Sequence, residues 1–560
     1  MAVEKLIVDH IDTWTTARQT RSTAGRGSSG KIDLYGIKKL RELILELAVR
    51  GKLVPQDPND EPASVLLKRI AAEKAELVKL GKIKKPKPLP EISEEEKSFE
   101  LPEGWEWVRF GSIYEMEYGN NLPQEKRSNS GEYNVYGSNG IVGTHNEACI
   151  KSPCIVIGRK GSAGALNLSD QAACWVTDVA YSTIPPSAMD LEFVFIQFHT
   201  LGLDTLGKGI KPGLNRNDAY NLTIAIPPQS EQKAIVSKVN ELMTLCDQLE
   251  QHSLTSLDAH QQLVETLLTT LTDSQNADEL AENWARISEY FDTLFTTEAS
   301  IDALKQTILQ LAVMGKLVPQ DPNDEPASEL LKRIAQEKAQ LMKDGKIKKQ
   351  KPLPPISDEE KPFELPDGWE WSRLDHVASK ITDGDHKTPP RIAEGYKLLS
   401  AKNIRDGFLD YENCDYISES SYIKSRERCL PEKGDLLIVS VGGTIGRSSL
   451  ITGNSEFALV RSVAIIKPLI IEPNFLKIAM DSQLLQSMIH SHKRGGAQPC
   501  LYLGEISKFL FPTPPLNEQR RIVKTVNIFM GILETLTLAF NSAQKTQLHL
   551  ADALTDAAIN

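Results

Sequence analysis

The stretch GKLVPQDPNDEPAS spans Gly51–Ser64 and recurs letter for letter at Gly315–Ser328. The likeness extends beyond it, because Gly51–Arg109 aligns with Gly315–Arg373 without a gap, and 48 of these 59 positions are identical. Segments so similar adopt the same fold, so the chain is expected to contain two copies of one scaffold. A chain of 560 residues would otherwise suggest three or four unrelated domains.

A second alignment pairs IPPQSEQKAIVSKVN (Ile226–Asn240) with TPPLNEQRRIVKTVN (Thr513–Asn527). Between the shared flanks lie two diverged segments, insert 1 (100–226) and insert 2 (364–512). The offset between the two copies rises from 264 residues before the inserts to 287 after them, so the second copy has 23 additional residues in this region. We call the repeated segments that flank the inserts the frame. Two copies of one frame around two diverged inserts favour two related domains of different specificity. The alternative is a plain duplication with drifting loops, but drift would not begin so sharply after Arg109.

Apolar residues at heptad spacing predict two long amphipathic helices, one over Pro228–Leu271 and one over Ile522–Leu554. A shorter helix is expected over Ala63–Leu80 and ends at Gly81. Shorter apolar stripes precede each frame and also predict helices. These stripes are Ile37, Leu40, Ile44 and Leu47, and Ile301, Leu304, Ile308 and Leu311.

The inserts contain short β-rich runs such as CIVIG (Cys154–Gly158) and DLLIVSV (Asp435–Val441), followed by glycine turns. The expected fold is α+β, with two mixed α/β domains separated by a pair of long antiparallel coiled-coil helices and related by a pseudo-two-fold repeat. Seven segments follow: a flexible basic tail (1–33), a helical segment with linker (34–99), insert 1 (100–226), a long helix with connector (227–297), a second helical segment with linker (298–363), insert 2 (364–512) and a C-terminal long helix (513–560).

The bulk composition is that of a soluble globular protein, with 40% apolar residues and a net charge of -11. It excludes a histone-like polycation, and on its face the charge opposes binding to nucleic acid. The seven cysteines are scattered without a C-x-x-C pair, which favours reduced thiols and argues against a zinc site. No apolar run has the length of a membrane span. A cytoplasmic location without a membrane is therefore expected.

Catalytic motifs are absent from the sequence: it has no phosphate-binding G-x-x-x-x-G-K-[ST], no dinucleotide fingerprint and no Pro-Pro-aromatic motif of the adenine methyltransferases. Asp383 and Asp385 beside His386 and Lys387 could form a nuclease centre. Because insert 1 has no equivalent, a turn with solvated charges is the favoured interpretation. The chain is therefore expected not to be an enzyme.

Each insert is entered through an LPxGWEW strand and left through a PPxxEQ helix. Insert 1 contains YGSNGIVGTHN (Tyr136–Asn146) and IVIGRKGS, and insert 2 contains DGDHKTP (Asp383–Pro389) and GDLLIVSVGGTIG. This set resembles the specificity subunit of type I restriction-modification systems, HsdS, in the subgroup with a long N-terminal segment. The resemblance implies two target recognition domains, each reading one half of a bipartite asymmetric site in double-stranded DNA.

The resemblance also implies partners. Two modification subunits would carry S-adenosylmethionine and methylate adenine, and two restriction subunits would use ATP and Mg²⁺. No cofactor is expected in this chain. Two alternatives stay open: a coiled-coil scaffold with two lobes that bind other ligands, and a self-sufficient DNA nuclease or methyltransferase.

Base-reading residues are expected near the glycine turns, because Arg can bind guanine bidentately and Asn or Gln can bind adenine. In insert 1 the candidates are Asn139, Arg159, Lys160, Ser162, Lys211, Asn215 and Arg216. In insert 2 they are His386, Lys387, Lys402, Asn403, Arg405, Thr444, Arg447, Arg494, Gln498 and Tyr502. Insert 1 has 9 Lys+Arg against 14 Asp+Glu and insert 2 has 18 against 19, so weak binding to DNA is expected without basic partner subunits.

Overall fold

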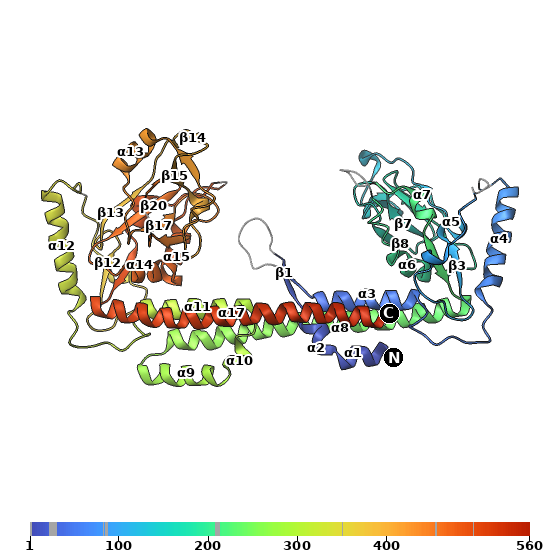
Figure 1. Ribbon diagram of the computed structural model, residues 1–560, viewed down its shortest axis with the longest axis horizontal. Helices are drawn as coiled ribbons and strands as arrows, with labels where there is room; N and C mark the ends of the chain where they lie inside the picture. The colour runs from blue at the N-terminus through green and yellow to red at the C-terminus, as the bar shows by residue number, and fades with distance from the viewer. Residues whose placement is uncertain are drawn as a thin grey trace. The chain divides into compact units, whose positions relative to one another are not determined.

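The computed structural model describes residues 3–21, 31–81, 83, 88–207, 213–349, 351–453, 456–496 and 498–559. The chain divides into two compact units, each with one frame and one insert (Figure 1). Unit 1 is built mainly from Ser29–Thr255 and Gln544–Asn560, together with the N-terminal helices. Unit 2 is built mainly from Ser256–Ala543.

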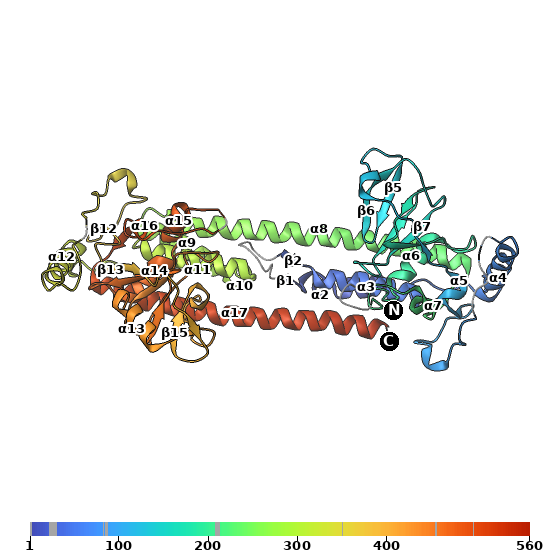
Figure 2. The ribbon, with the colours of Figure 1, turned by 90° about the horizontal axis from the view of Figure 1, so that it is seen from above.

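Both predicted long helices are present, as α8 (Gln229–Asp273) and α17 (Leu516–Ile559). The boundary between the units falls within both helices, so each unit contains the start of one and the end of the other. In unit 1, α3 (Tyr35–Val49) lies between them (Figure 2). The hydroxyl of Tyr35 donates a 2.6 Å hydrogen bond to Asp552 of α17, and Arg41 contacts Glu250 of α8 at 2.7 Å.

In unit 2, α11 (Glu298–Val313) takes the place that α3 has in unit 1, between the end of α8 and the start of α17 (Figure 2). Each copy of the repeat has a lysine, at equivalent positions, that binds the end of a long helix. Lys316 Nζ donates to the carbonyls of Thr272 and Ser274 at the end of α8, at 2.6 and 2.8 Å. Lys52, at the same place in the first copy, donates to the carbonyl of Ile559 at the end of α17 at 2.6 Å. In each unit, therefore, an equivalent lysine donates to main-chain carbonyls at the C-terminal end of a long helix.

The N-terminal residues differ from the predicted flexible tail. Residues 3–16 form α1 (Val3–Asp9) and α2 (Ile11–Thr16), and β1 (Gln19–Arg21) pairs antiparallel with β2 (Lys31–Asp33). Trp14 is fully buried. The prediction rested on charge and on Ser and Gly content, and it missed the apolar positions that this segment packs into the core of unit 1.

Each insert is closed at its base by a two-stranded antiparallel ladder. In unit 1, β3 (Glu106–Arg109) pairs with β11 (Thr223–Ile226), and in unit 2, β12 (Glu370–Arg373) pairs with β21 (Leu510–Thr513). The GWEW motif therefore enters the insert beside the strand that leaves it. One helix of the frame flanks each ladder, α4 (Ala63–Lys79) in unit 1 and α12 (Ala327–Lys343) in unit 2. As predicted, Gly81 follows α4, with a φ of +68° that favours glycine.

The inserts share most of their strand order although their sequences have diverged, and insert 2 has one further strand, β14, in its second sheet. Insert 1 has an antiparallel sheet of order β4-β10-β7-β8 and a smaller sheet of order β6-β5-β9, and insert 2 has β13-β20-β17-β18 and β14-β16-β15-β19. The smaller sheet contains a parallel pair in both, β5 with β9 and β15 with β19. This confirms the α+β class, with two mixed domains.

The strands of insert 1 are β4 (Glu117–Tyr118), β5 (Tyr133–Gly137), β6 (Gly140–His145), β7 (Cys154–Gly158), β8 (Leu166–Ser169), β9 (Trp175–Val176) and β10 (Ala180–Thr183). Those of insert 2 are β13 (Ala378–Asp383), β14 (Arg391–Ile392), β15 (Tyr396–Leu399), β16 (Asp415–Ile417), β17 (Leu436–Val439), β18 (Ser448–Leu450), β19 (Phe457–Leu459) and β20 (Val463–Pro468). The helices beyond the frame are α5 (Phe110–Ile113), α6 (Leu191–His199), α7 (Arg216–Tyr220), α9 (Ala277–Glu289), α10 (Phe291–Leu294), α13 (Glu419–Arg428), α14 (Pro473–Asp481), α15 (Gln483–His492) and α16 (Leu503–Ile506).

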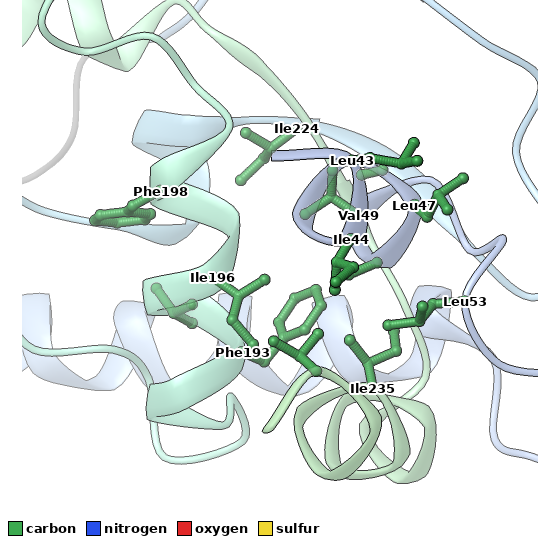
Figure 3. Packing of buried hydrophobic residues seen from close by; sticks show 14 of the residues in the cluster. Leu43, Ile44, Leu47, Val49, Leu53, Phe193, Ile196, Phe198, Ile224 and Ile235 are labelled. Carbon is green, nitrogen blue, oxygen red and sulfur yellow. The ribbon is translucent and has the colours of Figure 1, made fainter. Parts of the chain in front are cut away.

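The core of unit 1 lies where α3, α6, β11 and α8 meet (Figure 3). Leu43 and Ile44 of α3 pack there with Phe193 of α6, Ile224 of β11 and Ile235 of α8. The apolar stripes predicted for the two short helices are buried in both units. In the long helices, burial is concentrated at each end, at positions such as Ile235 and Leu271 of α8 and Ile522 and Ala551 of α17. Burial of this apolar surface holds insert, frame and long helix together as one unit.

In the described residues, one helix, α17, is long and apolar enough to cross a membrane by length and composition alone. Its residues Ile522, Val526 and Leu533 are buried in the core of unit 2, and Ala551 is buried in that of unit 1. These four positions serve protein packing, whereas Ile528, Ile532, Leu538 and Leu550 of the same helix are exposed.

Candidate nucleic-acid interface

The PPxxEQ motif is a joint that fastens the start of the long helix to the frame. In unit 1, Glu231 is buried and accepts hydrogen bonds from Trp105 Nε1 at 2.8 Å and from Gln56 Nε2 at 3.1 Å. Glu518 is the equivalent in unit 2 and accepts from Gln320 Nε2 at 3.1 Å. Burial raises the pKa of both carboxyl groups above the usual value.

The glutamine of the motif connects the same joint to the insert. Gln232 donates to the carbonyl of Pro227 at 3.2 Å and accepts from the backbone N–H of Asp190 at 2.9 Å, at the start of α6. In unit 2, Gln519 donates to the carbonyl of Pro514 and accepts from the N–H of Glu472 at the start of α14, both at 2.9 Å. Each insert therefore has a fixed orientation on its own long helix.

An ion pair ties the linker to the base of each insert. Arg109 is buried, contacts Glu96 at 2.7 Å and donates to the carbonyl of Asn221 at 2.7 Å. Its hydrogen bonds lower the pKa of Glu96 to about 2. Arg373 and Glu360 form the matching pair at 2.8 Å in unit 2.

The glycine turn predicted in insert 1 follows β7. A Cβ on Gly158 would lie 2.0 Å from the carbonyl oxygen of Ser162, so only glycine fits there, and Gly161 and Gly164 have φ of +84° and +79°. The turn lies beside the segment that precedes α7, because the N–H of Leu214 donates to the carbonyl of Arg159 at 2.9 Å.

This pairing brings two candidates together around an aromatic ring. The guanidinium carbon of Arg159 lies 4.7 Å from the ring centroid of Tyr118, and that of Arg216 lies 4.8 Å from it. Nη1 of Arg159 donates to the carbonyl of Asp178 at 2.8 Å, and Nη1 of Arg216 donates to the carbonyl of Met116 at 3.0 Å. The ring is half exposed. We call Arg159, Tyr118 and Arg216 the arginine clamp.

The remaining candidates of insert 1 have different surroundings. Asn139 is exposed in the turn between β5 and β6, and Lys160 is exposed in the glycine turn, where Ser162 is half buried. Asn215 caps α7, since its side chain accepts from the N–H of Asn217 at 3.0 Å. Lys211 lies outside the described residues.

Insert 2 has the same strand-and-turn arrangement with other side chains. The N–H of Leu501 donates to the carbonyl of Ser440 at 2.8 Å, just as that of Leu214 donates to Arg159 in insert 1. Nearby, Asp383 at the end of β13 is buried and accepts from Arg428 Nη2 at 2.6 Å and from His386 Nε2 at 3.1 Å. Within the described residues, no three His, Cys, Asp or Glu side chains are grouped as metal ligands.

Several candidates of insert 2 are engaged with acidic neighbours. Lys402 contacts Asp415 at 3.0 Å, Arg405 contacts Asp410 at 3.5 Å, and Arg494 contacts Glu505 at 3.6 Å. All three cations remain partly exposed, so these contacts are weak and open to exchange. Exposed candidates of insert 2 are Lys387, Gln498 and Tyr502.

Asn403 does not fit its predicted role, because it is fully buried. Its side-chain oxygen accepts from the N–H of Ser400 at 3.0 Å, and its amide donates to the carbonyls of Asp410 at 3.0 Å and Asn413 at 3.2 Å. The amide holds its own loop and is not available to a base edge.

Thr444 and Arg447 line a cavity of about 1010 Å³ within unit 2, whose other walls come from α8, α11, Asp406 and the ends of α14 and α15 that carry Asp481, Gln483 and Gln486. The second glycine turn therefore faces the helices of its own unit at these two positions. The sequence shows that the two turns carry different side chains, but only the structure shows which surface each turn faces.

All seven cysteines are unpaired in the structure, as predicted. Cys154 and Cys174 lie closest, with their sulfur atoms 3.8 Å apart in the core of insert 1. The hydrogen bond from Cys154 lowers the pKa of Cys174 to about 7.

The family model described as type I restriction modification DNA specificity domain matches this chain twice, at residues 102–259 and 366–539, once for each insert with the start of its long helix. The chain is 50% identical to the type I restriction enzyme EcoAI specificity subunit and 46% identical to the EcoEI specificity subunit, both from Escherichia coli, over the full length of all three chains. The solved HsdS subunit from Thermoanaerobacter tengcongensis shares 17% identity with a TM-score of 0.37, with 83% of this chain and 98% of that chain covered. With two family domains and full-length relatives of this identity, the chain belongs to the DNA specificity subunits of type I restriction-modification systems.

Proposed function

We propose that insert 1 and insert 2 are target recognition domains that each read one half of a bipartite asymmetric DNA site. One observation carries this proposal: the two inserts have the same strand order in their four-stranded antiparallel sheet, on the same base, yet differ in chemistry at equivalent positions of that sheet. Such a pair suits one task performed on two different sequences. The match of the family model to both inserts favours this role over a scaffold for other ligands or a self-sufficient enzyme.

We further propose that the chain acts in the cytoplasm with two modification subunits and two restriction subunits. The former would supply S-adenosylmethionine and adenine methylation, the latter ATP- and Mg²⁺-dependent translocation and cleavage, and this chain would hold no cofactor. The charge of the inserts supports dependence on partners. Since neither insert has an excess of cations, most of the grip on DNA phosphates would come from other subunits, while this chain selects the bases.

The long helices would set the number of unread base pairs between the two half-sites, because α8 and α17 both continue from one unit into the other. A test is to remove seven residues from each helix at matching positions, 252–258 of α8 and 539–545 of α17. Seven residues correspond to about 10 Å of helix and about two turns, so the faces of the helices stay aligned. The expected result is a methylated motif whose spacer is shorter by about three base pairs.

The measurement is the genome-wide pattern of N6-methyladenine in cells that express this chain with its modification subunits. As a control, seven residues are removed from the KIKKQKPLPP linker (346–355), and the spacer should then stay unchanged. An unchanged spacer after the paired helix deletion, in a complex that still methylates, would refute the proposed role of the helices. Loss of methylation at only one half-site after replacing insert 1 would support the assignment of one insert to each half.

A further inference from the structure

The arginine clamp lies at a position where the two inserts can be compared residue by residue. In insert 1, Tyr118 of β4 is opposite Tyr181 of β10, which is opposite Ile157 of β7. In insert 2, Asp383 of β13 is opposite Ala464 of β20, which is opposite Ile438 of β17. The sheet orders match strand for strand.

The backbone bonds of Arg159 and Ser440 support this alignment of the two sheets. Each of these residues lies two positions after the isoleucine of its strand, and its carbonyl accepts from the N–H of Leu214 or Leu501, respectively. Asp383 therefore takes the position of Tyr118, and Ser440 takes that of Arg159. The alignment of the exit segments places Leu503 where insert 1 has Arg216. The whole clamp is thus replaced in insert 2, although the strands beneath it are retained.

The geometry of the clamp suits recognition of a flat, hydrogen-bonding ligand edge. Each guanidinium is held over the ring of Tyr118 and by one bond to a main-chain oxygen, which uses one of its five donors and leaves others for a ligand. The ring of Tyr181 packs against that of Tyr118, with the two ring centroids 5.1 Å apart. The hydroxyl of Tyr181 in turn donates to the carbonyl of Leu214 at 3.0 Å. Groups fixed in this way lose little conformational entropy on binding.

The electrostatics also favour a ligand with acceptor atoms. Among the described residues, no carboxylate within ion-pair distance of Arg159 or Arg216 is found, whereas Asp383 at the matching position in insert 2 is neutralised by Arg428. Insert 1 carries more acidic than basic residues, so two adjacent cations without a carboxylate partner are not explained by the stability of the fold.

We propose that the arginine clamp is the guanine-reading site of insert 1, with Arg159, Arg216 or both donating to the O6 and N7 atoms of guanine in the major groove. This inference rests on the proposed function of insert 1 as a target recognition domain. Guanine presents two acceptors on that edge, which match two donors of one guanidinium. Lysine has the same charge but not the planar pair of donors, so it serves as the diagnostic replacement.

The experiment uses the full complex with its modification subunits and maps methylated adenines for the wild-type chain and for Arg159→Lys and Arg216→Lys. The expected result is a loss of preference for guanine by about tenfold or more, at one or two adjacent base pairs of one half-site only, with the other half read as before. Tyr118→Leu should have the same effect because the ring holds both arginines, and Tyr118→Phe should have little. Arg127→Lys is the matched control, since Arg127 lies in the same insert and its Nε and Nη2 donate to the carbonyl of Leu122 in its own loop.

Two results would overturn the proposal. One is an unchanged motif in both lysine variants. The other is an equal loss of methylation over all sequences, with a shallower dependence on salt, which identifies the clamp as a phosphate contact. The unaltered second half-site reports that each variant has folded, and if one lysine variant does not assemble, the other gives the decision. A wild-type complex without any bipartite motif would instead refute the proposed function itself.

Discussion

Trp105 Nε1 donates a 2.8 Å hydrogen bond to Glu231 Oε2, joining two residues 126 positions apart, one at the start of insert 1 and the other just after its end. Trp105 belongs to the segment that enters the insert, and Glu231 to the first turn of α8. The bond is buried, so the base of the insert and the start of the long helix are held in one geometry whatever sequence the insert contains.

Glu231→Ala should destabilise unit 1, because the indole N–H of Trp105 would remain buried without its acceptor. Loss of a buried acceptor costs roughly 1–3 kcal/mol. The measurement is hydrogen exchange of the β3 and β11 amides in increasing urea, and their protection should fall. Glu241→Ala, an exposed glutamate of the same helix, is the control and should change protection little. Equal effects of the two variants would contradict the role of the joint.

Acid should weaken the attachment of the linker to insert 1 through Glu96. Its folded pKa is lowered to about 2 by Arg109, from a usual value near 4.5, so the pair stabilises the fold above about pH 4.5 and this contribution is lost as the pH falls towards 2. The midpoint of thermal unfolding should therefore decline more steeply in the wild type than in Glu96→Gln. The two curves should converge near pH 2, and parallel curves between pH 5 and 3 would be evidence against the pair.

Lys316→Met should loosen the end of α8, because Lys316 Nζ binds the carbonyls of Thr272 and Ser274. Cations at a helix C-terminus satisfy carbonyls that have no partner within the helix. Amide protection in the last two turns of α8 should drop by the equivalent of about 1–3 kcal/mol. Lys305→Met, at a more exposed position on α11, provides the comparison and should leave this protection intact. No change in either variant would show that the contact does not hold the helix end.

Asn403→Ala should lower the stability of insert 2 and leave the bases of the methylated motif unchanged. The buried amide makes its hydrogen bonds within its own loop, and their loss should lower the thermal midpoint by a few degrees. Lys402→Ala, at the exposed neighbouring position, should keep the midpoint. A changed motif with an unchanged midpoint in Asn403→Ala would restore the original prediction for this residue.

Much of the frame could be predicted from the sequence because repetition and periodicity are local signals. The two long helices and the buried stripes beginning at Ile37 and Ile301 were found from apolar spacing alone. The site could be predicted only in part. Arg159 and Arg216 were selected as isolated candidates, but Tyr118, which lies between them, was missed because only the pairing of β4 with β10 brings it there.

The sequence by itself determined that this protein has two copies of one frame, that each copy carries a different α+β insert, and that the chain resembles a DNA specificity subunit. These properties are encoded in residue identity and spacing along the chain. The tertiary structure decided which polar groups are available. It buried Asn403, turned Thr444 and Arg447 towards the helices of unit 2, and placed Arg159 and Arg216 on one ring, because strand pairing and burial join residues that are distant in sequence.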